Sequence, residues 1–108
     1  MYSKHKKLLK EFTLCIEEER FYDAHEALEE IWFPRRHEDN NEVRLLKGFI
    51  NASVAFELIK RGRQKPSDKA WANYIKYRPL LYRVSSPFLN DYHKLARELE
   101  YLKYQKKI

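Results

Sequence analysis

The stretch Val43–Ile59, which reads VRLLKGFINASVAFELI, decides the fold of this 108-residue chain. Its apolar residues cover most of the circumference of a helix: Val43, Leu45, Leu46, Phe49, Ile50, Ala52, Val54, Ala55, Phe56, Leu58 and Ile59. A helix that is apolar on most faces lies at the centre of a bundle, between other helices. We therefore expect a central helix over residues 40–61, with Gly62 just past its end.

Two features of this helix predict further details of the fold. Gly48 costs about 1 kcal/mol in a helix interior relative to Ala, so its presence predicts another helix that crosses closely at this point. The helix should begin near Asp39 or Asn40, because Asp39 and Glu42 have the spacing of a capping box.

Four other segments have the three- and four-residue spacing of amphipathic helices. Their expected ranges are residues 3–20, 23–33, 67–79 and 86–102. No segment alternates strictly enough to be a strand, and short connections favour antiparallel neighbours. The sequence thus predicts an all-α fold: a single compact bundle of about five helices, mostly antiparallel neighbours, in one domain over residues 1–108.

The ends of these helices have their own signals. Asp23 with Glu26 has the form of a capping box, and Ser86 before Pro87 is typical of a helix start. The run of acids at residues 17–19 opposes the helix dipole and predicts an early stop of the first helix. Ser67 is expected to begin the fourth helix, and Pro79 to stop or kink it.

Composition excludes several classes of protein. No apolar run reaches the roughly 18–20 residues of a membrane span, and no secretory signal opens the chain, so we expect a cytoplasmic protein without a membrane partner. The single Cys15 excludes an intramolecular disulfide and a multi-cysteine metal site. Only two glycines occur, so a phosphate-binding loop of the P-loop kind is excluded, and no cofactor is expected.

The charge is unevenly distributed along the chain. The net charge is +6 overall, whereas residues 11–42 hold eleven acids against three bases. Residues 60–83 hold one acid and eight bases: Lys60, Arg61, Arg63, Lys65, Lys69, Lys76, Arg78 and Arg83. Three interpretations stay open: binding of nucleic acid or another polyanion, self-association of the acidic region with the basic region of a second copy, and neutralisation or simple solvation within one fold.

The stretch around His25 is the one most suited to chemistry. His25 and Glu29 lie one helical turn apart, with Trp32 on the same face. The pair could bind a metal with ligands from Glu57, His37 or His93, act in acid–base catalysis on a bound ligand, or form a structural hydrogen bond between helices. In the structural interpretation, which is the favoured one, His25 bonds to Glu29 or to Asn51 on the central helix.

These residues also resemble a known family. The segment Tyr22–Trp32, followed by Leu46-Lys-Gly-Phe-Ile-Asn51, is similar to the DUF309 family of small helical proteins from bacteria and archaea. The matching positions are His25, Glu26, Glu29, Trp32, Gly48 and the Arg61-Gly62 turn, and the specific match covers residues 21–63. Asn51 stands where the family is expected to carry Gln.

The resemblance implies a bundle of about five helices and no established activity. We therefore predict a cytosolic, non-enzymatic interaction module that binds a partner protein or itself, with a structural cluster at His25, Glu29, Trp32 and Asn51. One alternative is a metal or ligand site with hydrolase-like chemistry at His25 and Glu29. The other is nucleic-acid binding through the basic residues of 60–83.

Overall fold

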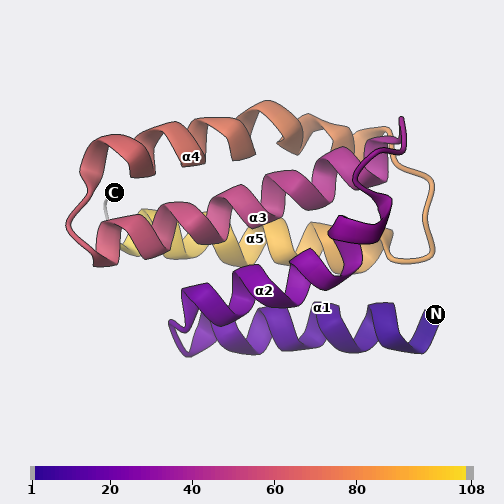
Figure 1. Ribbon diagram of the computed structural model, residues 1–108, viewed down its shortest axis with the longest axis horizontal. Helices are drawn as coiled ribbons and strands as arrows, with labels where there is room; N and C mark the ends of the chain where they lie inside the picture. The colour runs from indigo at the N-terminus through magenta and orange to yellow at the C-terminus, as the bar shows by residue number, and fades with distance from the viewer. Residues whose placement is uncertain (1, 107–108) are drawn as a thin grey trace.

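The computed structural model describes residues 2–106 and is helical throughout its regular elements (Figure 1). The elements are α1 (Tyr2–Glu17), α2 (Phe21–Trp32), the short 3₁₀ helix η1 (Phe33–Arg35), α3 (Asn41–Lys60), α4 (Gln64–Tyr77), the 3₁₀ helix η2 (Arg78–Tyr82) and α5 (Leu89–Lys106). Consecutive α-helices run antiparallel, so the predicted all-α bundle of five helices is confirmed. Within the described residues, no helix is long and apolar enough to cross a membrane.

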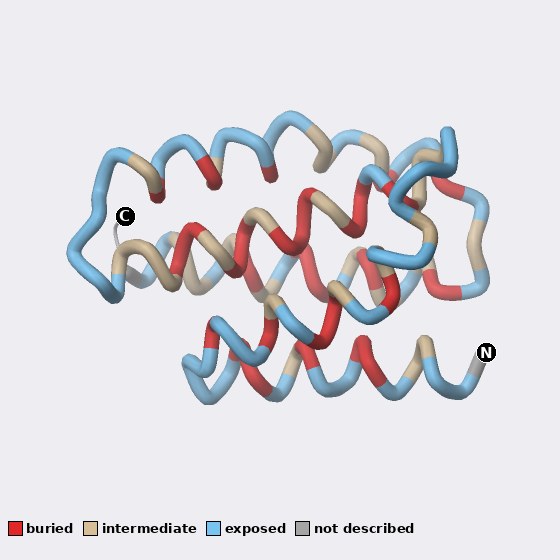
Figure 2. The backbone as a smooth tube through the Cα atoms, in the orientation of Figure 1, coloured by how far each residue is buried: buried red, intermediate tan, exposed pale blue. Residues whose placement is uncertain are grey.

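Helix α3 is the centre of the bundle, as its sequence predicts. It packs between α2 and α4, and α5 covers it from behind in the view of Figure 1. Half of its 20 residues are buried, and they lie between Val43 and Phe56, along the middle of the helix (Figure 2). Phe49 and Phe56 are among the largest fully buried side chains, together with Phe12 of α1, Tyr74 of α4 and Tyr92 of α5.

Gly48 marks the close crossing that its presence predicts. A Cβ atom built on Gly48 would lie 2.9 Å from the Cβ of Tyr77 at the end of α4. That separation is closer than carbon atoms approach without a clash, so only glycine lets α3 and α4 come this near.

Two helices end in the same way, although only one carries the usual glycine. After α3, Gly62 has a φ of 75°, and the amides of Gly62 and Arg63 donate to Ile59 and Leu58. After α1, Glu19 has a φ of 58°, and the amides of Glu19 and Arg20 donate to Ile16 and Cys15. Both patterns are Schellman motifs with the C′ residue in the left-handed region. The early stop of α1 at Glu17 was predicted; the left-handed Glu19 was not.

The predicted helix starts are correct for two helices and wrong for others. Asn40 caps α3, since its side chain accepts hydrogen bonds from the amides of Glu42 and Val43. The Ser86 hydroxyl accepts a hydrogen bond from the amide of Phe88, and Ser86 lies three residues before the first residue of α5, Leu89. The capping box at Asp23 is wrong: α2 already begins at Phe21, whose buried ring stacks on Phe56 at a centroid distance of 5.3 Å.

The predicted start of α4 at Ser67 is also wrong. The helix begins three residues earlier, at Gln64, and Ser67 is buried inside it. The Ser67 hydroxyl donates to the carbonyl oxygen of Ala55 at 2.7 Å and ties α4 to α3. Pro79 lies beyond the helix, because α4 ends at Tyr77 and the chain tightens into η2.

Candidate functional site

The His25–Glu29 pair of the family motif lies on one side of α2. The Nε2 atom of His25 lies 3.2 Å from Oε2 of Glu29, one turn further along the helix. The Tyr22 ring meets the His25 ring edge-on at a centroid distance of 6.0 Å. The side chains of His25 and Glu29 are 23% and 37% exposed, so the pair borders the core without entering it.

Of the two partners that the sequence offers His25, the structure places Glu29 beside it and Asn51 elsewhere. The side-chain amide of Asn51 donates to the carbonyl oxygen of Lys47, one turn back in α3, at 2.9 Å. Short polar side chains in a helix often bond their own backbone in this way. Among the hydrogen bonds of the described residues, none joins Asn51 to α2, so of the two alternatives the structure has the neighbour Glu29 and not Asn51.

The remaining motif residues are divided between two surfaces. Trp32 packs partly against the core, and Nζ of Lys47 lies 4.3 Å from its ring centroid, a cation–π contact between α2 and α3. Glu26 is exposed to solvent. Gly48 faces α4 and contributes nothing to the α2 surface.

Metal binding by the His25–Glu29 pair lacks further ligands in the described part of the chain. No group of three or more His, Cys, Asp or Glu side chains there is placed to hold a metal ion. The pair alone can share a proton or accept a hydrogen bond from a partner molecule, because one ring and one carboxylate are half-exposed on the same face.

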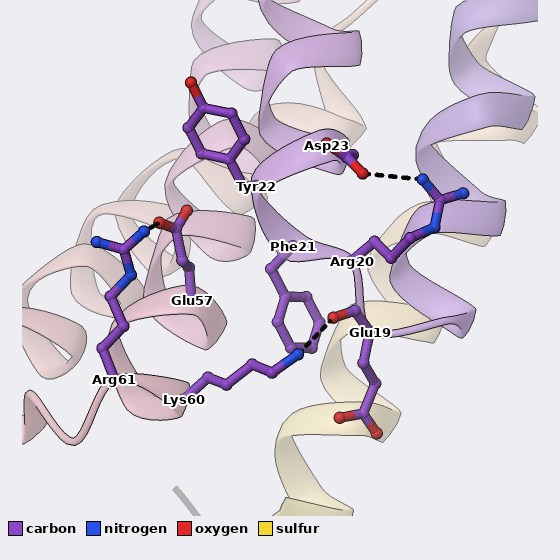
Figure 3. Close-up of a pocket in the computed structure, with 8 residues that line it drawn as sticks. All are labelled: Glu19, Arg20, Phe21, Tyr22, Asp23, Glu57, Lys60 and Arg61. Atoms are coloured by element: carbon purple, nitrogen blue, oxygen red, sulfur yellow. Dashed lines mark hydrogen bonds and ion pairs between the residues drawn. The ribbon is translucent and has the colours of Figure 1, made fainter.

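A hollow of about 290 Å³ lies where the α1–α2 turn meets the end of α3 (Figure 3). It brings together two parts of the resemblance, the Tyr22-Asp23 start of the motif and Arg61 of the Arg61-Gly62 turn. Its charged lining residues are Glu19, Arg20, Asp23, Glu57, Lys60 and Arg61.

Each of the three cations in this hollow has a partner there. Arg20 bonds Asp23 at 2.9 Å and Arg61 pairs with Glu57 at 2.9 Å. Nζ of Lys60 donates to the backbone oxygen of Glu19 at 3.2 Å. Three cations and three carboxylates around one small hollow favour neither an anionic nor a cationic ligand.

The eight basic residues predicted as a polyanion surface are dispersed. Lys60 and Arg61 belong to the hollow at the end of α3, whereas Arg83 lies near the start of α3. Arg78 bonds Glu100 of α5. The exposed bases that remain include a row on one face of α4, Lys65, Lys69 and Lys76, with Arg63 just before the helix.

Sequence reasoning missed a polar network centred on Glu42. Oε2 of Glu42 accepts hydrogen bonds from the hydroxyls of Ser86 at 2.7 Å and Tyr92 at 2.5 Å. Its other oxygen pairs with Arg35 at 3.3 Å, and its side chain is only 14% exposed. His5 of α1 completes the network, with Nε2 3.0 Å from the Tyr92 oxygen.

The donors in this network can be assigned. A carboxylate only accepts, so the single Tyr92 proton goes to Glu42 and the Tyr92 oxygen accepts from the Nε2–H of His5. Burial alone would raise the pKa of Glu42, but the hydrogen bonds from Tyr92, Ser86 and Arg35 outweigh it and lower that pKa. Burial lowers the pKa of His5, whose ring stacks on Phe88 at a centroid distance of 3.8 Å.

This network joins segments that are far apart in sequence. It ties α1, η1, the start of α3, the loop before α5 and α5 itself at one end of the bundle. The only signal in the sequence was the capping spacing at Glu42, which says nothing about partners 44 and 50 residues away. The network holds the helices together and offers no open reactive group.

The fold and the motif residues define the class: a small helical bundle whose candidate functional residues, in the part of the chain that the structure describes, are side chains at the surface. A family model described as a domain of unknown function, DUF309, matches residues 9–69. The chain therefore belongs to the DUF309 family, and the match extends beyond the motif on both sides. Neither the search of curated proteins nor the search of solved structures finds a match.

Proposed function

We propose that this protein is a cytoplasmic, non-enzymatic interaction module that binds a second copy of itself. In the proposed dimer, the acidic edge at α2 of each copy faces the basic edge at α4 of the other. One observation carries the proposal: the two edges lie on opposite sides of α3 and do not neutralise each other within one molecule.

The charged side chains of these two edges are exposed and available to pair with a second molecule. Glu26 and Glu30 are exposed and one turn apart on α2, and Lys69 and Lys76 are exposed on α4. In the part of the chain that the structure describes, none of these four side chains takes part in an ion pair. The interpretation that acids and bases neutralise each other within one fold therefore has no support at these helices.

The two edges are also in register along α3. Phe21 and Ser67 mark the same level of α3, since they contact Phe56 and Ala55. Trp32 and Tyr77 mark the other end, beside Lys47 and Gly48.

A two-fold axis parallel to α3 then sets α2 of one copy against α4 of the other. With a rise of about 1.5 Å per residue, Glu30 falls level with Lys76, and Glu26 falls within reach of Lys69. The same axis brings a partly exposed stripe of α3, formed by Asn51, Val54 and Leu58, against its own copy.

This arrangement gives Glu26, an exposed residue of the family motif, a role in the dimer. An isologous contact uses every pair twice, so each acid–base pair is made at both edges of the dimer. Exposed pairs contribute only about 0.2–1 kcal/mol each and are screened by salt. The apolar stripe of α3 supplies the burial that these pairs lack, and they select the partner and the orientation.

Charge reversal tests the proposal in solution. We expect wild type to sediment as a dimer at low ionic strength and to dissociate as salt rises. Glu26→Lys/Glu30→Lys and Lys69→Glu/Lys76→Glu should each be monomeric, and their equimolar mixture should regain a dimer. Lys7→Glu/Lys10→Glu, which reverses two exposed charges on α1, is the matched control and should behave as wild type.

The contrary outcomes are equally clear. A wild-type monomer at millimolar concentration and low salt contradicts the proposal, as does a dimer that both reversed variants retain. Salt-sensitive binding of RNA that is lost in Lys69→Glu/Lys76→Glu, with no dimer in wild type, would instead assign the basic edge to a polyanion.

A further inference from the structure

The groove between α1 and α5 lies away from the edges proposed for the dimer. Two hollows of about 360 Å³ each follow it and share Glu17. Its apolar lining includes Leu9, Leu14 and Leu95 in one hollow and Ile16, Tyr101 and Leu102 in the other. Leu14 is 49% exposed and Tyr101 is 65% exposed, so large apolar side chains meet solvent here.

Glu98 is the unusual residue of this groove. Its Oε2 atom is buried and has no hydrogen-bond partner among the residues that the structure describes. Burial, reinforced by the nearby charge of Glu17, raises the pKa of Glu98. A buried acceptor without a donor costs free energy, and such a group in a folded protein needs an explanation.

The charges along the groove have a direction. Glu19 and Glu98 line the end near Tyr101, and Glu17 lies where the two hollows meet. Lys10 and Lys94 line the other end, where Lys6 and Asp91 pair with each other. A ligand that covers the whole groove must therefore present a cation at one end, an anion at the other and apolar groups between them.

We propose that the α1–α5 groove is the docking site for an amphipathic helix of a partner protein, with an arginine or lysine of that helix donating to Glu98. A helix fits because its apolar side chains, spaced three and four residues apart, can cover Leu14 and Tyr101 while its polar face stays in water. The cation of the partner would pair with the Glu98 carboxylate where this residue lines the groove beside Glu17 and Glu19.

A designed peptide tests the site directly. The probe is an 18-residue helix of alanines with leucines along one face, two glutamates in its first turn and two arginines in its last turn. The matched peptide replaces both arginines with glutamine. We expect fluorescence anisotropy with the full chain to show at least tenfold weaker binding of the glutamine peptide.

Protein variants give the second arm of the test. Glu98→Gln should weaken the arginine peptide about tenfold and leave the glutamine peptide unchanged, with a melting temperature no lower than that of wild type. Glu11→Gln, an exposed acid of α1 outside the groove, should leave both affinities unchanged. Equal binding of the two peptides, no binding of either, or full binding to Glu98→Gln would overturn the proposal. If wild type forms a dimer and the Leu14→Arg variant does not, the proposal is also overturned, because a second copy would then occupy the groove.

Discussion

Removing the Tyr92 hydroxyl should weaken the Glu42 network and destabilise the protein. Tyr92 is fully buried, so Tyr92→Phe keeps the packing of the ring and removes only one oxygen. That oxygen donates to Glu42 at 2.5 Å and accepts from His5 at 3.0 Å. The variant leaves the carboxylate with one donor fewer and the imidazole N–H without an acceptor.

The size of the effect follows from these two bonds. A hydrogen bond to a charged group contributes about 1.5–3 kcal/mol, and a neutral one about 0.5–1.5 kcal/mol. Allowing for relaxation, Tyr92→Phe should lower the free energy of unfolding by about 2–3 kcal/mol. For a domain of this size that corresponds to a melting temperature lower by roughly 10–20 °C.

Urea denaturation followed by circular dichroism at neutral pH measures this loss. Tyr104→Phe, which changes an 82% exposed tyrosine in α5, is the matched control and should stay within about 0.5 kcal/mol of wild type. A Tyr92→Phe protein as stable as the control would refute the claim that the Glu42 network stabilises this end of the bundle.

The same network sets the direction of the pH dependence. The pKa of Glu42 is lowered in the folded state, so its contribution to stability is present above the unfolded pKa near 4.3 and is lost as the pH falls through the folded pKa. The pKa of His5 is also lowered, so its contribution weakens as the pH falls below about 6.5. We expect acid denaturation of Tyr92→Phe to begin at a higher pH than in wild type.

Three further predictions concern single residues. Glu98→Gln should raise the urea midpoint at pH 7 and reduce the difference between pH 5 and pH 7, because the raised pKa of Glu98 makes the ionised form costly in the folded state; an unchanged midpoint at both pH values would contradict this. Gly48→Ala should lower the free energy of unfolding by about 1–3 kcal/mol, because the new methyl group would lie 2.9 Å from the Cβ of Tyr77. Identical thermal melting curves of the variant and wild type would contradict this. Glu19→Gly should stabilise by up to about 1 kcal/mol, since Glu19 has a φ of 58°, and a lower melting temperature would argue against strain at this turn.

The fold was predictable where it depends on local patterns. The nearly continuous apolar surface of Val43–Ile59 identified α3 as the central helix, and Gly48 identified the close contact with α4. Both follow from side-chain volume and helical spacing alone. Helix starts were predicted less well, because capping competes with burial: α2 begins at Phe21, which packs on Phe56, and not at the better cap Asp23.

The candidate site was predictable only within one helix. The approach of His25 to Glu29 follows from their spacing of four residues, and the structure has it. The expected bond to Asn51 depended on how α2 and α3 are rotated against each other, which spacing does not specify. The Glu42 network and the unsatisfied Glu98 depend on packing between distant helices, so no local signal could indicate them.

Cross-linking between two variants that each carry one added cysteine tests the proposed dimer most directly. Glu30→Cys and Lys76→Cys place one new thiol on α2 and one on α4, and the native Cys15 is buried, with a pKa that burial raises, so it reacts slowly. With a short bifunctional maleimide, we predict a cross-linked dimer when the two variants are mixed, and little when either is treated alone. A mixture that cross-links no better than the separate variants would contradict the pairing of α2 with α4.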